Sequence, residues 1–185
     1  MSQNFNELIV YSKAFSGLTP ELEACLKDIA PYIVPHLNRV TDCFYEQLSS
    51  IPVTEKFLVG RIDRLKTAHL KWLTDLFTVN IDAQFAESMY KVGDIHVKAN
   101  LPVEFMAGAM TLINIELIKL VAGTMGDDLD KCPQALQAIT AVTGLALMVM
   151  QQSYQESSMA EELGKFLRIS GMSRTLFTNL AKAYN

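Results

Sequence analysis

The stretch KVGDIHVKANLP, residues 91–102, decides how the chain around it folds and what that part of the chain can hold. On an α-helix, His96 falls on an apolar stripe, while the opposite face carries charges. The stripe consists of Phe85, Met89, Val92, His96 and Ala99. A lone histidine on such a face is either a hydrogen-bonded core residue or a ligand for a metal or cofactor. The spacing alone leaves both interpretations open.

The end of this predicted helix is specified by its own residues. Asn100 tolerates the left-handed backbone that commonly ends a helix, and Leu101-Pro102 then starts another helix. Gly93 removes a side chain one turn before His96, where something bulky can approach. The inward residues of the next helix are expected to be Leu101, Phe105, Met106 and Met110. The result is an apolar wall with one projecting nitrogen, as haem with a proximal histidine requires.

A tyrosine in an upstream helix is a candidate for the opposite side of such a pocket. In DCFYEQL, residues 42–48, Phe44 and Tyr45 are adjacent, so one side chain packs while the other points into a cavity. A buried tyrosine hydroxyl can donate a hydrogen bond to bound dioxygen. The alternative is an amphipathic core residue with its hydroxyl in water.

The segment RIDRLKTAHLKWLTDLF, residues 61–77, supplies a second apolar stripe. With Leu58 just before the segment, the stripe comprises Leu58, Ile62, Leu65, His69, Trp72 and Leu76. Leu65 and the small Ala68 beside it would leave room above a bound ligand. His69 shares this face and could compete as a second axial ligand, but we expect it to pack or to face the pocket edge. His36 lies in a proline-flanked segment and is expected at the surface.

Helical spacing prevails along the chain and strand-like alternation is absent. Proline, glycine and asparagine divide the sequence into about seven helical segments. Thr19, Thr54 and Asp82 are the expected N-caps. The expected helices cover residues 3–14, 20 onward with breaks at Pro31 and Pro35, 38–50, 55–77, 83–99, 102–125 and 133–163. The tail after residue 163 reads as a Gly/Ser-broken linker with a short amphipathic piece.

The composition is that of a single intracellular domain. The chain has 185 residues, 50% hydrophobic and 19% charged, which favours a large core or a subunit interface. The net charge of −4 gives no electrostatic footprint for nucleic acid. An odd count of three separated cysteines excludes a complete disulfide framework and fits a reducing cytoplasm. The N-terminus lacks the apolar core of a signal peptide.

One uncharged stretch, residues 133–155, is nearly long enough to span a membrane. Glutamines and threonines interrupt it, and it lacks flanking basic clusters and aromatic belts. It is therefore interpreted as a helix buried on most of its circumference, in a core or a dimer interface, and no membrane is expected as a partner.

These motifs together resemble the globin domain of globin-coupled sensors, the bacterial haem-based gas sensors that include globin-coupled diguanylate cyclases and aerotaxis transducers. The resemblance spans about residues 20–160. It rests on FYEQL (44–48), RLKTAHLKWL (64–73), VGDIHVKANLP (92–102) and the long apolar terminal helices. It implies an all-α globin fold with an extra N-terminal helix and two long last helices, and haem b as cofactor.

The resemblance also implies roles for individual residues. His96 matches the proximal iron ligand, Tyr45 the distal hydrogen-bond donor to oxygen, and Leu65 a residue that gates access. Family members commonly have glycine where this sequence has Asn100. The remaining expected pocket residues are Phe44, Ala68, His69, Trp72, Met89, Val92, Leu101, Phe105 and Met106. Oxygen is the expected ligand, with CO and NO as further candidates, and the chain is expected to form a homodimer through its last two long helices.

The expected organisation is a sensor globin domain at residues 1–163 and a connector, or the start of an output module, at residues 164–185. The resemblance implies a cytoplasmic, non-enzymatic sensor domain whose signal is read by an output domain such as a diguanylate cyclase. The alternative is a non-haem globin-like dimeric signalling module. An NO dioxygenase would need an electron supply, and no GxGxxG fingerprint is present. A carboxylate-bridged metal bundle lacks its Glu-x-x-His pair.

Overall fold

The computed structural model describes residues 3–183, and within that range the chain is helical nearly throughout and contains no strand. The helices are α1 (Phe5–Ser16), α2 (Pro20–Ile33), α3 (Leu37–Ser50), α4 (Glu55–Leu58), α5 (Ile62–Thr78), α6 (Ala83–Lys98), α7 (Val103–Met125), α8 (Lys131–Ser170) and α9 (Arg174–Ala183). Short 3-10 turns cover Val34–His36 and Pro52–Thr54. The expected all-α class, the additional N-terminal helix and the two long late helices are confirmed.

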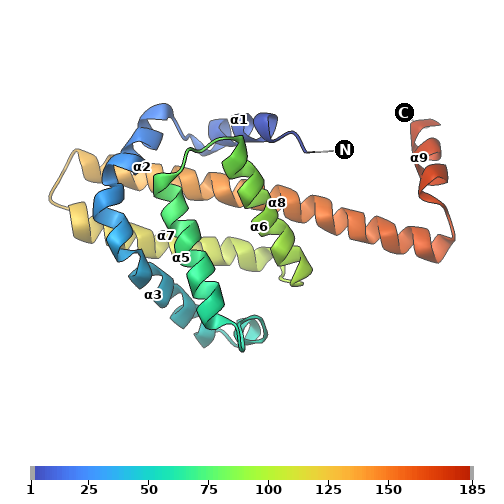
Figure 1. Cartoon of the computed structure of the whole chain (residues 1–185), viewed down its shortest axis with the longest axis horizontal. Coiled ribbons are helices and arrows are strands. Elements are labelled where there is room, and N and C mark those ends of the chain that lie inside the picture. Colours follow the sequence, from blue (N-terminus) through green and yellow to red (C-terminus); the bar gives the residue numbers. More distant parts are fainter. Residues whose placement is uncertain (1–2, 184–185) are drawn as a thin grey trace.

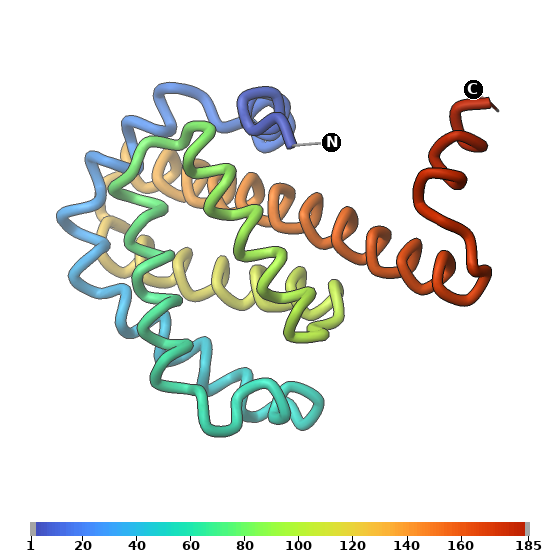
Figure 2. The backbone as a smooth tube through the Cα atoms, turned by 45° about the vertical axis from the view of Figure 1, so that its right-hand side comes forward, coloured from blue at the N-terminus to red at the C-terminus, as the bar shows by residue number. Residues whose placement is uncertain are grey.

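The molecule is built on an antiparallel pair of helices, α7 and α8, which runs along its long axis (Figure 1). Helices α1, α2 and α6 pack against α8, and α3 packs against both α5 and α7. One continuous apolar core joins these helices, with Leu37, Leu73, Leu117 and Leu145 fully buried in it. The last part of α8 extends beyond this body and carries α9 at its far end (Figure 2).

The helix starts follow local capping chemistry. The Thr19 hydroxyl accepts a hydrogen bond from the backbone N–H of Leu22 at 3.3 Å. The Asp82 carboxylate accepts from the N–H groups of Gln84 at 2.9 Å and Phe85 at 3.2 Å. Each cap satisfies N–H groups that have no partner within the helix. Both predicted N-caps are therefore confirmed.

The predicted helix at residues 55–77 is wrong, because the chain breaks into α4 and α5. Gly60 adopts a left-handed conformation with φ of 71°, which ends α4 and redirects the chain. Thr54 occupies the predicted N-cap position of α4, but its side chain makes no capping bond; its hydroxyl instead donates to the carbonyls of Leu48 and Ile51, the latter at 2.7 Å. The expected break at Pro31 is also absent, since this proline lies within α2 on the exposed side.

Helix α8 continues past residue 163 and ends at Ser170, where Gly171 has a left-handed φ of 69°. No residue from 158 to 170 is buried. The boundary between residues 1–163 and 164–185 stays a prediction, and the helix itself shows no break there. Helix α9 contacts α8 through the edge-to-face pair Phe166–Phe177, whose ring centroids are 6.3 Å apart.

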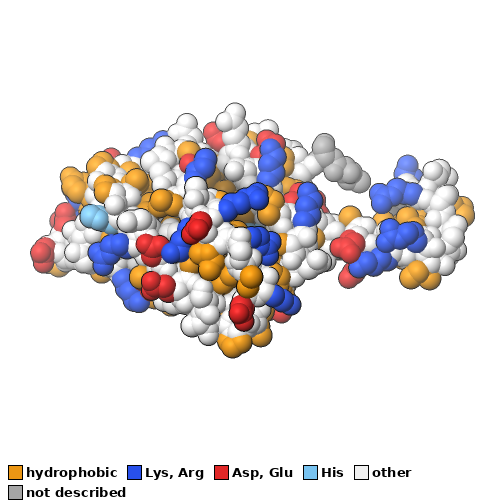
Figure 3. Space-filling model, turned by 60° about the horizontal axis from the view of Figure 1, so that its bottom comes forward, with side chains coloured by type: hydrophobic (Ala, Val, Ile, Leu, Met, Phe, Trp, Pro, Cys, Tyr) orange, Lys and Arg blue, Asp and Glu red, His pale blue; other side chains and the backbone are white. Residues whose placement is uncertain are grey.

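Helices α7 and α8 are both long and apolar enough to cross a membrane by length and composition alone. Core helices pass the same test, and both helices bury residues in this body: Leu117 and Val121 from α7, and Val142, Leu145 and Val149 from α8. The face of the body in Figure 3 has charges of both signs interspersed with apolar patches. Packing in the core therefore accounts for much of the apolar character of these helices.

Candidate functional site

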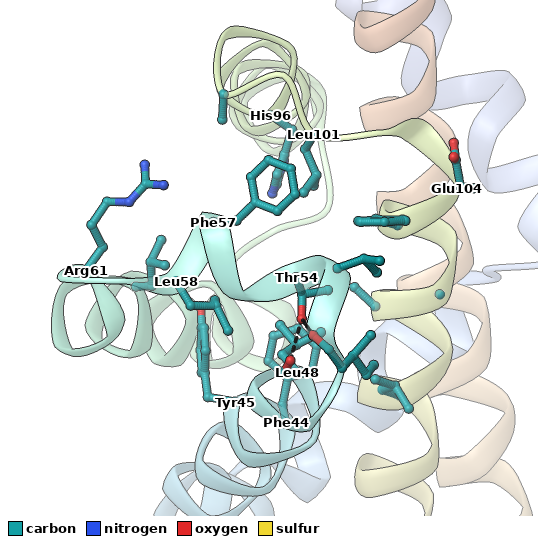
Figure 4. Close-up of a pocket in the computed structure, with 18 of the residues that line it drawn as sticks. Phe44, Tyr45, Leu48, Thr54, Phe57, Leu58, Arg61, His96, Leu101 and Glu104 are labelled. Atoms are coloured by element: carbon teal, nitrogen blue, oxygen red, sulfur yellow. Dashed lines mark hydrogen bonds between the residues drawn. The ribbon is translucent and has the colours of Figure 1, made fainter.

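A cavity of about 470 Å³ opens between α3, α4, α5, α6 and α7 (Figure 4). Its size falls in the range of roughly 300–1,000 Å³ typical of small-molecule and cofactor sites. The lining is Phe44, Tyr45, Leu48, Ile51, Val53, Thr54, Phe57, Leu58, Arg61, Leu65, Ile95, His96, Ala99, Leu101, Glu104, Phe105, Gly108, Ala109 and Leu112. Apart from one cation and one carboxylate, Arg61 and Glu104, these side chains are mostly apolar. The site therefore suits a largely apolar ligand.

The end of α6 holds His96 in a fixed backbone setting. Asn100 has φ of 52°, the left-handed conformation predicted for it. The N–H of Leu101 donates to the His96 carbonyl at 3.0 Å, and the N–H of Asn100 donates to the Val97 carbonyl at 2.8 Å. This pair of bonds is the Schellman motif, which satisfies carbonyls that would otherwise lack partners at a helix end.

The imidazole of His96 is oriented by its own helix. Its Nδ1 lies 2.8 Å from the Val92 carbonyl oxygen. Because a carbonyl only accepts, Nδ1 carries the proton and Nε2 keeps its lone pair. Burial lowers the pKa of His96, although the bond to Val92 opposes the shift, so the ring is neutral at pH 7. Such a second bond to the far nitrogen is what orients histidines that bind metals.

Tyr45 reaches the cavity from α3, on the side opposite His96 (Figure 4). The side chain is buried, and within residues 3–183 its hydroxyl makes no hydrogen bond. Burial raises the pKa of Tyr45 to about 12, so the hydroxyl stays protonated at neutral pH. The structure therefore presents a hydrogen-bond donor to whatever occupies this side of the cavity.

His69 lies behind this wall and does not line the cavity. Its ring is stacked on Phe44, with centroids 4.7 Å apart, and on Trp72, at 5.5 Å. Both ring nitrogens are buried and have no hydrogen-bond partner among the described residues. Burial lowers the pKa of His69 to about 4, so the ring is neutral at pH 7. His69 therefore packs between Phe44 and Trp72, and the expectation that it belongs to the pocket lining is wrong.

The other expected pocket residues divide into two groups. Phe44, Leu65, Leu101 and Phe105 line the cavity together with His96 and Tyr45. Ala68, Trp72, Met89, Val92 and Met106 do not. Ala68 is exposed on α5 and Met106 belongs to the core. The Trp72 indole N–H donates to the Met89 sulfur at 3.0 Å, which ties α5 to α6 away from the cavity.

Sequence reasoning missed the contribution of α4 and of the middle of α7. Val53, in the 3-10 turn before α4, and Phe57, in α4, line the cavity beside Leu58, which the sequence had placed on the stripe of Leu65; the left-handed Gly60 separates this region from α5. Gly108, Ala109 and Leu112 follow Phe105 at helical spacing, so the periodicity of α7 could have found them. Val53 and Phe57 had no comparable signal, because their place depends on the turn.

Comparison with known proteins points to one family. The family model described as Protoglobin matches residues 5–160. The globin domain of the Geobacter sulfurreducens globin-coupled sensor is 25% identical, with 78% of this chain and 95% of that chain covered and a TM-score of 0.72. The globin domain of E. coli DosC, in its ferric and ferrous forms, is 19% identical, with 76% and 97% covered and a TM-score of 0.65. The likeness to DosC concerns the fold alone.

Proposed function

Because the chain belongs to the protoglobin family, we propose that it is the globin domain of a haem-based gas sensor, with His96 as the proximal iron ligand. One observation carries the proposal. His96 lines an apolar cavity with its Nδ1 proton engaged by Val92, which leaves the Nε2 lone pair for a metal, and Tyr45 lines the opposite side.

The residues present fit haem b. Leu65, Leu101 and Phe105 supply apolar surface for the macrocycle, and the neutral imidazole supplies the iron ligand. Arg61, the cation of the lining, is the residue suited to the haem carboxylates, whereas Glu104 would repel them. Haem, when bound, supplies the iron at which a diatomic gas binds.

Tyr45 is the residue that would favour oxygen over gases that carry less charge when bound. Its protonated hydroxyl would donate a hydrogen bond to a ligand on the side opposite His96. A hydrogen bond that involves charge contributes about 1.5–3 kcal/mol, which changes affinity tenfold or more. Leu65 lines the same cavity and would restrict access of water and gas. CO and NO are further ligands in this proposal.

The proximal assignment is tested by reconstitution with haem and absorption spectroscopy. The wild-type chain should give a strong Soret band, and His96→Ala should lose haem or its normal axial ligation. Added imidazole should restore ligation in this variant. His36→Ala, at an exposed histidine outside the cavity, is the matched control and should keep the wild-type spectrum. An unaltered spectrum of His96→Ala would contradict the proposal. A wild-type chain that stays colourless would instead favour a non-haem signalling module.

A homodimer through α7 and α8 is also part of the proposal. Helix α7 carries an exposed stripe of Thr111, Ile115, Ile118 and Ala122. Two isoleucines about 40% exposed on one stripe favour contact with another protein surface. Ile115→Glu should convert a dimer to a monomer in analytical ultracentrifugation. Arg64→Glu, an exposed substitution on α5, should leave the mass unchanged. A monomeric wild-type chain would contradict this part.

The signal is proposed to leave the domain along α8. This helix projects beyond the body, and its last residues pack against little but α9 (Figure 1). In the proposed role, gas binding shifts α6 and the dimer between two arrangements, and an output domain such as a diguanylate cyclase responds in the cytoplasm. The globin domain itself senses and does not catalyse.

A further inference from the structure

A cluster of polar side chains lies where α6 crosses α8, on the face of α6 away from the cavity. We call it the polar seam; it consists of Tyr90 and Asp94 from α6 and Gln152, Ser153, Glu156 and Ser157 from α8. The hydroxyls of Ser153 and Ser157 both donate to Asp94 Oδ1, at 2.8 and 2.6 Å. The Tyr90 hydroxyl donates to Glu156 at 2.6 Å. The seam therefore joins the two helices at two levels, one helical turn apart.

The hydrogen-bond partners of both seam carboxylates, Asp94 and Glu156, are neutral side chains. Neither Asp94 nor Glu156 forms an ion pair within the part of the chain that the structure describes. Glu156 also accepts from the Gln152 amide at 2.7 Å. Burial, and next the bond to Glu156, raise the pKa of Tyr90, so its hydroxyl remains a donor at neutral pH. Hydrogen bonds to charged acceptors are among the stronger ones in proteins.

The backbones of the two helices touch at the seam. Gly93 is buried, and a Cβ placed on it would lie 2.5 Å from the Met150 carbonyl oxygen and 2.9 Å from Ser153 Cβ. The Tyr154 hydroxyl also donates to the Leu101 carbonyl, in the turn that ends α6. Residues on both sides of His96 in the sequence are thus held by one short stretch of α8. The proximal helix cannot slide along α8 without breaking these bonds.

The same stretch of α8 marks the point where that helix leaves the body. Residues 152–157 carry the seam, and no residue from 158 to 170 is buried. Figure 1 shows α6 lying across α8 just before its projecting part. A movement of His96 would therefore reach α8 at the root of that projection.

We propose that the polar seam is a positioning element, in which Asp94, held by Ser153 and Ser157, fixes the helix of His96 on α8 and couples the two. This inference rests on the proposed haem ligation by His96. Asp94 touches neither the cavity nor the iron site and acts through α6. The seam makes α6 and the exit of α8 move as one unit, so strain at the proximal imidazole passes into α8 instead of dissipating within α6.

The test compares Asp94→Ala and the double variant Ser153→Ala/Ser157→Ala with the wild-type chain. The first readout is the iron–histidine stretching vibration of the ferrous, gas-free haem protein, measured by resonance Raman spectroscopy. The second is amide hydrogen exchange of residues 150–158, with and without CO. Both variants should shift the vibration, speed exchange by about tenfold or more, and lose the CO-dependent change in α8.

Two controls separate positioning from general stability. Asp94→Asn keeps the Oδ1 acceptor but loses the charge, so its effect on both readouts should be clearly smaller than that of Asp94→Ala. Glu87→Ala, which removes the exposed 2.7 Å ion pair to Lys91 on the same helix, should leave both readouts unchanged. The inference is overturned if haem binds through His96 but Asp94→Ala leaves the vibration and α8 exchange as in wild type, or if Asp94→Asn matches Asp94→Ala. Loss of the proposed function would appear separately, as an unaltered spectrum in His96→Ala.

Discussion

The two sides of the cavity differ in how their polar groups are satisfied. On the α6 side, His96 bonds to Val92, the helix end is closed by the Schellman motif, and Asp94 accepts two serine hydroxyls. On the α3 and α5 side, the Thr41 hydroxyl and both nitrogens of His69 are buried without partners among the described residues. The α6 side is therefore arranged to hold the His96 imidazole in one orientation. The α3 and α5 side leaves buried polar groups without hydrogen-bond partners, and Tyr45 is its donor that reaches the cavity.

Among the proposed substitutions, Gly93→Ala should disturb the close packing of α6 on α8 most. A Cβ there would meet the Met150 carbonyl at 2.5 Å, so α6 and α8 would have to separate. Overpacking of this kind costs about 1–3 kcal/mol or more, against roughly 1 kcal/mol gained in helix propensity. Urea unfolding should show a clear net loss of stability. Gly123→Ala on α7 meets nothing within 4 Å and should stabilise the chain slightly; equal effects of the two would refute the tight contact.

On the α3 and α5 side, the buried His69 should make the free energy of unfolding depend on pH. The pKa of His69 is lowered to about 4 by burial, whereas an unfolded histidine titrates near 6.5. The stability that comes from keeping His69 neutral is therefore complete above about pH 6.5 and is lost as the pH falls towards 4. The loss should reach about 3 kcal/mol.

The variant His69→Phe isolates this contribution, because it keeps a ring between Phe44 and Trp72 and removes both unpartnered nitrogens. It should be more stable than wild type at pH 7 by about 1–3 kcal/mol. In thermal unfolding between pH 4 and 7, the variant should also lose less stability at acid pH than the wild-type chain does. Part of the loss that remains in the variant comes from His96, whose pKa is also lowered by burial. Identical pH profiles in the two proteins would place the acid sensitivity elsewhere.

The donor on the same side is tested by Tyr45→Phe. In the proposed distal role, removing the hydroxyl would delete a hydrogen bond worth about 1.5–3 kcal/mol to a partly charged ligand, so oxygen should dissociate at least tenfold faster. CO, which carries little charge, should be much less affected and serves as the internal control. Stopped-flow measurement decides the matter, and an unchanged oxygen off-rate would remove Tyr45 from the distal role.

The smallest expected effect concerns the closure of α6 at Asn100. Asn100→Ala places a less tolerant residue at φ of 52° and should cost about 1 kcal/mol of unfolding free energy. Asn100→Gly keeps the left-handed conformation accessible and should be neutral or slightly stabilising. Chemical denaturation of the pair measures the difference. Equal losses in both variants would mean that the asparagine side chain, and not the backbone, is required.

Much of the site on the α6 side could be predicted because its determinants are local. The stripe that carries His96, the left-handed Asn100 and the caps at Thr19 and Asp82 are set by neighbours within a few residues. The α4 region could not be predicted in the same way. Gly60 was compatible with a continuous helix by spacing, whereas in the structure it adopts a left-handed φ of 71° between α4 and α5.

His69 shows the same limit for a side chain. Spacing puts it on the stripe of Leu65, and this pattern fits both an iron ligand and a packed residue, of which we expected the second. The choice came from Phe44, a residue on another helix, which stacks against the ring and holds it outside the cavity. Helical periodicity predicts which face of the helix a residue occupies. It does not predict which residue of another helix will pack against it.

The sequence by itself determined the all-α class, most helix boundaries, the helix face of His96 and the closure of its helix, because apolar spacing and hydrogen bonds within a few residues fix these features. Only the tertiary structure decided which residues enclose the cavity, where His69 packs, and that Asp94 is bound to α8 59 and 63 residues further along the chain. Such contacts depend on how whole helices pack, and the packing is set by the summed burial of many side chains rather than by any short motif.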